Sequence, residues 1–413
     1  MCFAMSLSHF WGQTPIIKTT KSNYETFKKS IELSFLSKTF QGAIDVTKAL
    51  GEIQAAKIAS IYRNAYLTLA ATGAAGSSEG LFLLPGERVR ELPGMKRAWM
   101  LQEQMLSLRL LHFTEDELLW ECDSSQGIPN WYATMQSYIP RGLTYDRDRL
   151  PAISALSKLF SELSSLGTYY AGIWASEIVS RLMWQASQPG RRTHADGVFD
   201  SQPPTWSWAS VESCRTQWQL LNDKHEPKSE AEVLDIACYP STRDPKGMVS
   251  GGHVTLRSKL LALRIKWHSH IEAQSPPPGS EGYFVSVRDD TPWPKTTKWT
   301  PEDELEIPSG VPEFARFAIV IYPDVPLYAP SEGPKSGGRI YFLKMALVSV
   351  GSKEQQAYGL FLREVDPLSE VPVAAPDDLR NRRLFRRIGL GVIQDDDVGK
   401  DLESCPLEII TII

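Results

Sequence analysis

The feature of this sequence that most constrains its fold is a change of pattern along the chain. Over residues 6–125, apolar residues at helical spacing, as at 97–106, alternate with short apolar runs at 66–72, 108–113 and 118–122. This alternation of helix and strand patterns indicates an α/β layered fold. In the last part of the chain the helical spacing gives way to strand-like runs separated by Pro-rich and Gly-rich loops. The sequence therefore predicts an α/β N-terminal unit and a β-rich C-terminal unit, either a sandwich or a barrel.

The middle of the chain has a different character. Residues 153–166 and 170–186 carry apolar side chains at helical spacing, which predicts helices. A polar loop over 188–204 leads to Trp206 and Trp208, which we expect to pack the middle region onto the N-terminal domain. A chain of 413 residues is long enough for two packed units. The predicted divisions are an N-terminal domain at 6–125, a helical middle region at 126–230 and a β-rich C-terminal region at 231–413.

The composition is that of an ordinary globular protein, with 42% hydrophobic and 23% charged residues. A net charge of −5 gives no attraction to a phosphate backbone, so we do not expect a nucleic-acid partner. The five cysteines have no paired or metal-ligand spacing, which fits a reducing compartment. No run is long enough to cross a bilayer, and no signal peptide opens the chain. We therefore expect a cytoplasmic protein with no metal site, no cofactor and no membrane partner.

One basic cluster lies near the C-terminus. It is followed closely by an acidic run at 395–397. Charges of both signs so close in sequence predict a solvated face whose charges compensate one another. The cluster consists of Arg380, Arg382, Arg383, Arg386 and Arg387.

Several short motifs follow one another along the chain. They read Leu-Ser-His-Phe-Trp-Gly at 7–12, Ile-Tyr-Arg-Asn-Ala-Tyr-Leu-Thr-Leu-Ala-Ala at 61–71, Arg-Ala-Trp-Met-Leu-Gln-Glu at 97–103 and Trp-Glu-Cys at 120–122. Downstream come Gly172-x-Trp174 and Pro-Thr-Trp-Ser-Trp-Ala-Ser at 204–210. In order and spacing these motifs resemble the heterokaryon-incompatibility (HET) domain proteins of fungi. The resemblance implies self/non-self recognition and programmed cell death, through an interaction or signalling module that binds a protein partner or itself.

One block of the family pattern is missing from this chain. In HET domains the helix that corresponds to residues 40–51 is followed by a strand and an acidic loop, whereas here Gly51 runs directly into Glu52. Deleting a strand removes hydrogen bonds and apolar area from the neighbouring strands, so the resemblance implies an incomplete N-terminal unit. We interpret the join either as an exon lost from the gene prediction or as the mark of a decayed copy.

HET domains in turn resemble the TIR fold, which implies a TIR-like three-layer N-terminal unit. Trp99 and Glu103 are four residues apart and therefore share one face of a helix. This spacing is similar to the TIR pattern in which the glutamate takes part in cleaving the nicotinamide–ribose bond of NAD. The resemblance implies Glu103 as the catalytic residue, with NAD as a substrate and not as a cofactor. The substrate-binding candidates are Ser8, Trp11, Gly12, Arg97, Trp99 and Gln102.

Each candidate also has a structural interpretation. A Trp and a Glu at helical spacing commonly form a core anchor and a solvated or ion-paired carboxylate. His9 and His112 have no carboxylate or cysteine at ligand spacing, so we interpret both as structural. The competing functions are therefore a death-inducing interaction module, an NAD-cleaving enzyme and an inactive truncated paralogue.

Overall fold

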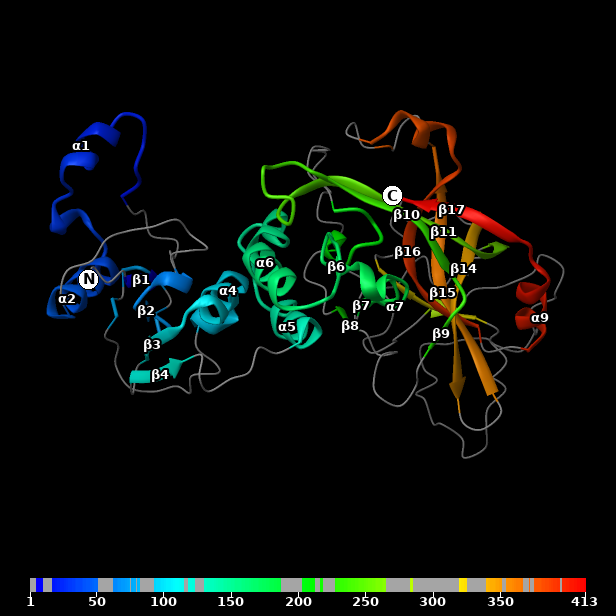
Figure 1. Cartoon of the computed structure of the whole chain (residues 1–413), viewed down its shortest axis with the longest axis horizontal. Coiled ribbons are helices and arrows are strands. Elements are labelled where there is room, and N and C mark those ends of the chain that lie inside the picture. The colour runs from blue at the N-terminus through cyan, green and yellow to red at the C-terminus, as the bar shows by residue number, and fades with distance from the viewer. Residues whose placement is uncertain are drawn as a thin grey trace, which may run out of the picture. The chain divides into compact units, whose positions relative to one another are not determined.

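The structure is a computed structural model of the chain, and it contains both helices and sheets (Figure 1). It divides into two compact units, Met1–Glu162 and Leu163–Ile413. The domain boundaries expected at residues 125 and 230 stay predictions. The residues that the structure describes are 5–9, 17–50, 62–74, 76–78, 80–81, 93–114, 118–122, 130–186, 203–211, 216–217, 227–264, 283–284, 319–324, 339–350, 354–366, 371, 375–393 and 396–413.

The first unit contains a four-stranded sheet in the order β1-β2-β3-β4. Strands β1, β2 and β3 are parallel, and β4 pairs antiparallel with β3. Parallel neighbours require crossover connections, and α2 and α4 lie within these connections in sequence. The predicted α/β pattern is confirmed at this level. The bounds are β1 (Met5–Ser8), α2 (Lys38–Leu50), β2 (Leu67–Ala70), α4 (Ala98–Leu106), β3 (Arg109–Phe113) and β4 (Leu118–Cys122).

The two faces of this sheet are covered by different helices. Leu67 and Leu69 of β2 lie on one face and cluster with Ala43 of α2. Ala70, one residue further along β2, lies on the other face and clusters with Met100 of α4. Successive side chains of a strand point to opposite faces, so one short strand supplies both layers of core. The shorter helices of this unit are α1 (Tyr24–Lys29), η1 (Leu33–Phe35), η3 (Pro93–Lys96), α5 (Trp131–Tyr138), η5 (Asp146–Asp148) and η6 (Pro151–Ile153), and α6 (Ser154–Leu163) ends it.

Strand β1 lies at one edge of the four-stranded sheet. The junction between Gly51 and Glu52 falls outside the described residues, so the loss of a strand-plus-loop block stays a prediction. Sequenced transcript across this junction tests it directly, because a block lost in gene prediction leaves extra codons there.

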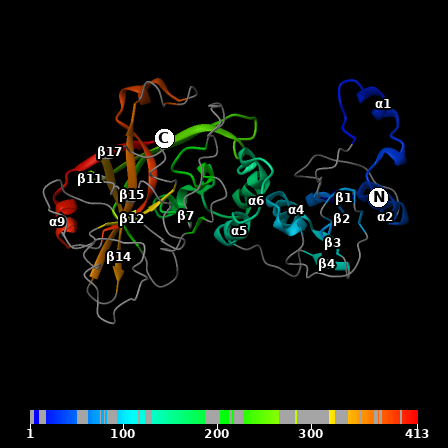
Figure 2. The same ribbon diagram turned by 180° about the vertical axis from the view of Figure 1, so that it is seen from behind.

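The second unit is built on a nine-stranded, largely antiparallel sheet, as the strand-like runs of its sequence predict (Figure 2). Its main path runs β10-β11-β14-β15-β16-β13-β12, with β17 pairing β11 and β16, and β9 pairing β14. The bounds are β9 (Lys228–Ser229), β10 (Glu232–Pro240), β11 (Val249–Arg264), β12 (Tyr283–Phe284), β13 (Ile319–Pro323), β14 (Arg339–Val350), β15 (Glu354–Val365), η11 (Asp377–Asn381), β16 (Leu384–Ile393), α9 (Asp396–Ser404) and β17 (Leu407–Ile412).

The prediction of a helix over 170–186 is wrong for its first part. Ala171 and Gly172 both have positive φ, at 42° and 96°, and form a tight hairpin turn. A residue pair with left-handed backbone cannot continue a right-handed helix, so two short strands replace it. The elements between residues 169 and 217 are β5 (Tyr169–Tyr170), β6 (Ile173–Trp174), η7 (Ala175–Glu177), α7 (Ile178–Leu182), β7 (Gln185–Ala186), η8 (Trp208–Ser210) and β8 (Thr216–Gln217).

Four tryptophans of the second unit, Trp174, Trp184, Trp206 and Trp208, are fully buried. Trp208 donates its indole N–H to the carbonyl of Gly172 at 3.2 Å, and Ser207 donates its hydroxyl to the carbonyl of Ala171 at 2.6 Å. Trp184 donates its indole N–H to the carbonyl of Trp206 at 2.8 Å. These contacts lie within the second unit, and the packing of Trp206 and Trp208 onto the N-terminal domain stays a prediction.

Replacing Gly172 by Ala is expected to destabilise the second unit by about 1–3 kcal/mol. A Cβ at this position would lie 2.4 Å from Nε1 of the buried Trp208, and φ is in the left-handed region. Urea denaturation of the full chain measures the change. Gly399→Ala is the matched control, because nothing lies within 4 Å of its Cβ position and Ala favours the helix. Equal stability of the two variants would contradict this account of the turn.

A fully buried ion pair joins β16 to Asp324, the residue that follows β13. The guanidinium of Arg387 on β16 donates to Asp324 at 2.8 and 3.0 Å, and both side chains are fully buried. The same guanidinium donates to the carbonyls of Leu182 and Trp184 and lies 3.6 Å from the centroid of the Trp184 ring. The backbone N–H of Arg387 donates to the hydroxyl of Thr205 at 3.1 Å. This residue therefore ties β16 to the tryptophan-rich segment.

The prediction of a solvated, self-compensating basic cluster is wrong for Arg387, which lies in the core. Arg382 and Arg383 do carry compensated charges at the surface. Arg382 pairs with Asp378 at 2.6 Å, and Arg383 pairs with Glu364 at 2.7 Å. Neither partner belongs to the acidic run at 395–397: Asp378 lies four residues before Arg382, and Glu364 lies on β15, which pairs with β16.

Candidate active site

The carboxylate of Glu103 on α4 is the centre of the candidate site. Ser8, the last residue of β1, donates its hydroxyl to Glu103 Oε2, and its Oγ lies 2.8 Å from Sδ of Met100. The phenol of Tyr62, just before β2, also donates to the carboxylate. Residues from two strand regions of the sheet therefore meet on the face of α4 that packs against the sheet. Glu103 itself is partly buried.

Arg97 brings a positive charge to this group. It is the N-cap residue of α4 and has an extended backbone. The N–H of the next residue, Ala98, donates to the carbonyl of Gly142 at 3.0 Å, and this bond holds the backbone of Arg97 in place. Its guanidinium donates to the carbonyl of His9 at 3.0 Å. Its charge is close enough to Glu103 to favour the ionised carboxylate.

Burial and charge act in opposite directions on Glu103. Burial raises the pKa of the Glu103 carboxyl above its usual range, and this effect exceeds the lowering by the Ser8 and Tyr62 hydroxyls and by Arg97. Burial, and then the charge of Glu103, raise the pKa of Tyr62, so the phenol stays a neutral donor. Burial and the neighbouring Arg97 lower the pKa of His9 to about 4, so its imidazole is neutral at pH 7.

Two of the expected substrate-binding side chains make structural contacts instead. The indole N–H of Trp99 donates to Asp148 of η5. The side-chain oxygen of Gln102, which is buried, accepts from the N–H of Ala155 at 3.0 Å and so caps the start of α6. Both residues anchor the helices that follow the sheet. Trp11 and Gly12 lie outside the described residues.

The sequence motifs indicated Ser8, Arg97 and Glu103 but gave no role to Tyr62. His9 was interpreted as structural, and it provides its backbone carbonyl to Arg97. Tyr62 stands in the motif at 61–71, so the resemblance included it without assigning it any chemistry. Its partner Glu103 is far away in sequence, and no spacing pattern links the two residues. Only the packing of β2 beside α4 brings the phenol to the carboxylate.

A second cluster of polar side chains, beside α4, has a structural role. The hydroxyl of Thr72 lies 2.7 Å from Nδ1 of His112, and Nε2 of His112 lies 3.3 Å from Oε2 of Glu121. Gln104 of α4 donates to the same carboxylate at 3.0 Å. Thr72 and His112 are fully buried, so a substrate does not reach the hydroxyl. The contact with Glu121 crosses between strands, which is why sequence spacing does not reveal it.

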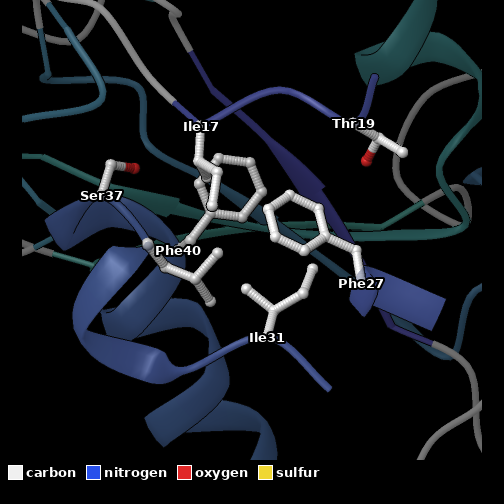
Figure 3. A pocket seen from close by; sticks show the side chains of 7 residues that line it. Ile17, Thr19, Phe27, Ile31, Ser37 and Phe40 are labelled. Atoms are coloured by element: carbon white, nitrogen blue, oxygen red, sulfur yellow. The ribbon is translucent and has the colours of Figure 1, made fainter. Parts of the chain in front are cut away.

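An apolar pocket lies beside the candidate site (Figure 3). Its volume is about 130 Å³. Phe40 of α2 lines it and also packs edge-on against the ring of His9, with centroids 4.7 Å apart. Phe40 therefore lines the pocket and also contacts His9, whose carbonyl accepts the hydrogen bond of Arg97. The lining residues are Ile17, Thr19, Phe27, Ile31, Leu36, Ser37 and Phe40.

Within the described ranges, no group of three or more His, Cys, Asp or Glu side chains is placed to hold a metal ion. None of the helices in those ranges has the length and apolar character needed to cross a membrane. No family model, curated protein or solved structure matches this chain.

Proposed function

We propose that this chain is a HET-like protein of self/non-self recognition and programmed cell death, and that its first unit is a TIR-like fold whose effector site is Glu103. One observation carries the proposal. Residues from three separate motifs surround the Glu103 carboxylate. Ser8 and Tyr62 donate hydrogen bonds to it, and Arg97 places a positive charge near it. The parallel order β1-β2-β3, with helices on both faces, supports the fold. In open α/β sheets, ligands bind beyond the carboxyl ends of strands, and Ser8 ends β1.

The proposed reaction is cleavage of the N-glycosidic bond between nicotinamide and ribose in NAD. The bond breaks with its electron pair going to the nicotinamide nitrogen, and positive charge builds on the ribose ring. The ionised Glu103 carboxylate stabilises this charge, as carboxylates do in glycoside hydrolysis. Water then adds to the ribose carbon and loses a proton, which yields free nicotinamide and ADP-ribose. The Ser8 and Tyr62 hydroxyls hold the carboxylate in place, and the positive charge of Arg97 favours its ionised form.

The pH dependence of cleavage follows from the raised pKa of Glu103. Activity requires the carboxylate, so the rate should rise with pH and reach half of its plateau above the ordinary pKa of a glutamate. Tyr62→Phe removes a hydrogen bond that lowers the pKa of Glu103, so the rising limb should move to higher pH. Initial rates measured from pH 4 to 9 test both statements. An unchanged or lower midpoint in Tyr62→Phe would show that the phenol does not act on Glu103.

A second candidate function, an interaction module, is favoured by the surface of the first unit. The segment that contains α1 and η1 exposes four large apolar side chains, and neither element has a buried residue. Apolar residues gathered on one exposed segment commonly mark contact sites between proteins. The exposed residues are Tyr24, Ile31, Leu33 and Phe35.

Inducible expression in a fungal host separates the two candidates. The proposal predicts cell death preceded by loss of cellular NAD, and it predicts that Glu103→Gln prevents both. Death without NAD loss, prevented by Phe35→Ser but not by Glu103→Gln, would favour the interaction module. Healthy cells that accumulate folded protein without NAD loss would point to an inactive paralogue.

A further inference from the structure

Strand β4 forms an open edge of the four-stranded sheet in the first unit. Within the described part of the chain it pairs with β3 alone, and it ends the order β1-β2-β3-β4 (Figure 1). Alternate backbone N–H and C=O groups of an edge strand point away from the sheet, where they can bond to another strand. The hydrogen-bonding pattern of this edge therefore fits a partner that adds a strand, and it fits neither a helix nor a small molecule.

The apolar face of this sheet continues onto β4. Phe113 of β3 belongs to the core cluster that α2 covers, and Leu111 packs against that cluster. The strand register places Leu118 beside Phe113 and Trp120 beside Leu111, on the same face. Leu118 and Trp120 are nevertheless 57% and 55% exposed. Exposed apolar side chains on an open backbone edge are typical of a strand that pairs with another chain.

The sequence of β4 is complementary to a second copy of itself. A two-fold axis perpendicular to the sheet pairs two β4 strands antiparallel and keeps each face of the sheet continuous across the axis. With the axis at Trp120, the Trp120 rings of the two copies lie opposite each other. Leu118 of each copy then lies opposite Cys122 of the other, so the exposed apolar side chains cover one another.

The two neighbouring registers are disfavoured by charge. With the axis at Leu119, Glu121 of each copy lies opposite Glu117 of the other. With the axis at Glu121, the two Glu121 side chains lie opposite each other. Like charges directly opposite across a strand pair are destabilising. The axis at Trp120 avoids both arrangements, because it places Glu121 opposite Leu119.

The two ends of the β3–β4 hairpin carry opposite charges. The connection between the strands reads Glu-Asp-Glu at 115–117. The other end carries Arg109, which lies beside Cys122 in the register. Its guanidinium donates to the carbonyl of Tyr66 at 3.3 Å and lies 5.1 Å from the centroid of the Tyr66 ring, and both of these partners are uncharged. An antiparallel pair of hairpins brings the acidic end of each copy toward Arg109 of the other, which favours the pair.

We propose that two copies of this chain associate through β4, so that their four-stranded sheets join into one continuous sheet with Trp120 at the two-fold axis. Pairing of five residues buries little area, so we expect a dissociation constant on the order of 10 µM. This interface goes beyond NAD cleavage and does not rest on it. A dimer that cleaves no NAD would leave the interface assigned and refute the catalytic proposal, whereas cleavage by a monomer would do the reverse.

Sedimentation velocity of the full chain over a range of concentrations tests the proposal. We expect a monomer–dimer equilibrium that Trp120→Lys weakens by about tenfold or more, because two like charges then lie opposite each other at the axis. Leu163→Lys is the matched control, since Leu163 at the end of α6 is 53% exposed, and it should associate as the wild type does. A wild-type protein that stays monomeric would overturn the proposal. A dimer that Phe35→Ser weakens and Trp120→Lys does not would overturn it as well, and would place the interface on the segment of α1 and η1.

Disulfide formation tests the register of the two strands. Directly opposite residues of antiparallel strands have Cα atoms about 4.5–5.5 Å apart, a separation that a disulfide spans. Leu118→Cys should therefore bond to the Cys122 thiol of the second copy when diamide oxidises the two thiols, giving a covalent dimer that a reductant separates. Leu163→Cys should stay monomeric on the same non-reducing gel. A folded Leu118→Cys protein that forms no more covalent dimer than Leu163→Cys would overturn the pairing with Trp120 at the axis.

Discussion

Replacing Glu103 by Gln is expected to slow NAD cleavage by about a hundredfold or more, as happens when one electrostatic group that stabilises a transition state is removed. Gln keeps the size of the side chain and still accepts the hydroxyl of Ser8, but it has no charge to place against the developing cation. Initial rates of nicotinamide release, measured at the pH plateau of the wild type, give the comparison.

The stability of this variant should move in the opposite direction from its activity. Burial raises the folded-state pKa of Glu103 above its unfolded value, so the folded state is favoured at low pH and loses stability as pH rises through the raised pKa. At pH values above that raised pKa, the ionised carboxylate is therefore a cost to the fold. Glu103→Gln should melt at or above the wild-type temperature at pH 7, and the difference should shrink toward pH 4.

The matched control is Glu162→Gln, which removes an exposed carboxylate paired with Arg63 at 3.2 Å in the same unit. It should change neither the rate nor the melting temperature appreciably. A Glu103→Gln protein that melts well below the wild type would assign Glu103 a structural role. Full activity with normal melting would remove Glu103 from the mechanism.

Replacing Asp324 by Ala is expected to lower the free energy of unfolding of the second unit by about 3–5 kcal/mol, because it leaves a buried charge uncompensated. The partner, Arg387, is fully buried, and its guanidinium also donates to the backbone carbonyls of Leu182 and Trp184, which carry no net charge. Chemical denaturation of the full chain, followed by tryptophan fluorescence, reports the change because Trp184 lies against Arg387.

Two controls separate loss of the pair from loss of packing. Asp378→Ala removes an exposed carboxylate paired with Arg382 and should cost less than about 1 kcal/mol. Combining Asp324→Leu with Arg387→Met replaces the whole pair by apolar groups and should recover much of the stability lost in Asp324→Ala. A double variant as unstable as Asp324→Ala would show that the charge is not what makes the single change costly.

Local patterns predicted the elements of the first unit well. The helix expected over 97–106 is Ala98–Leu106, and the strands expected over 108–113 and 118–122 are Arg109–Phe113 and Leu118–Cys122. These elements are specified by short-range information, namely apolar spacing and a polar turn between two strands. The same information misled over residues 170–174, where apolar residues at helical spacing flank a left-handed turn. Gly172 was the one local signal of that turn.

The candidate site was predictable only in part, because its members come from distant segments. Ser8, Arg97 and Glu103 were identified by resemblance to a family, and the residue spacing itself would not have joined them. Tyr62 reaches Glu103 only through the packing of the segment before β2. The burial of Arg387 was equally hidden, since its partner Asp324 lies 63 residues away in the sequence. Long-range pairs of this kind leave no periodic signal.

The most direct test of the central claim is release of nicotinamide from NAD by the purified full-length chain, followed by proton NMR. The account predicts nicotinamide and ADP-ribose in equal amounts, formed in proportion to the protein and lost in Glu103→Gln but not in Glu162→Gln. A cooperatively melting wild-type protein that releases no more nicotinamide than its Glu103→Gln variant would contradict the claim that Ser8, Tyr62 and Arg97 assemble a catalytic carboxylate.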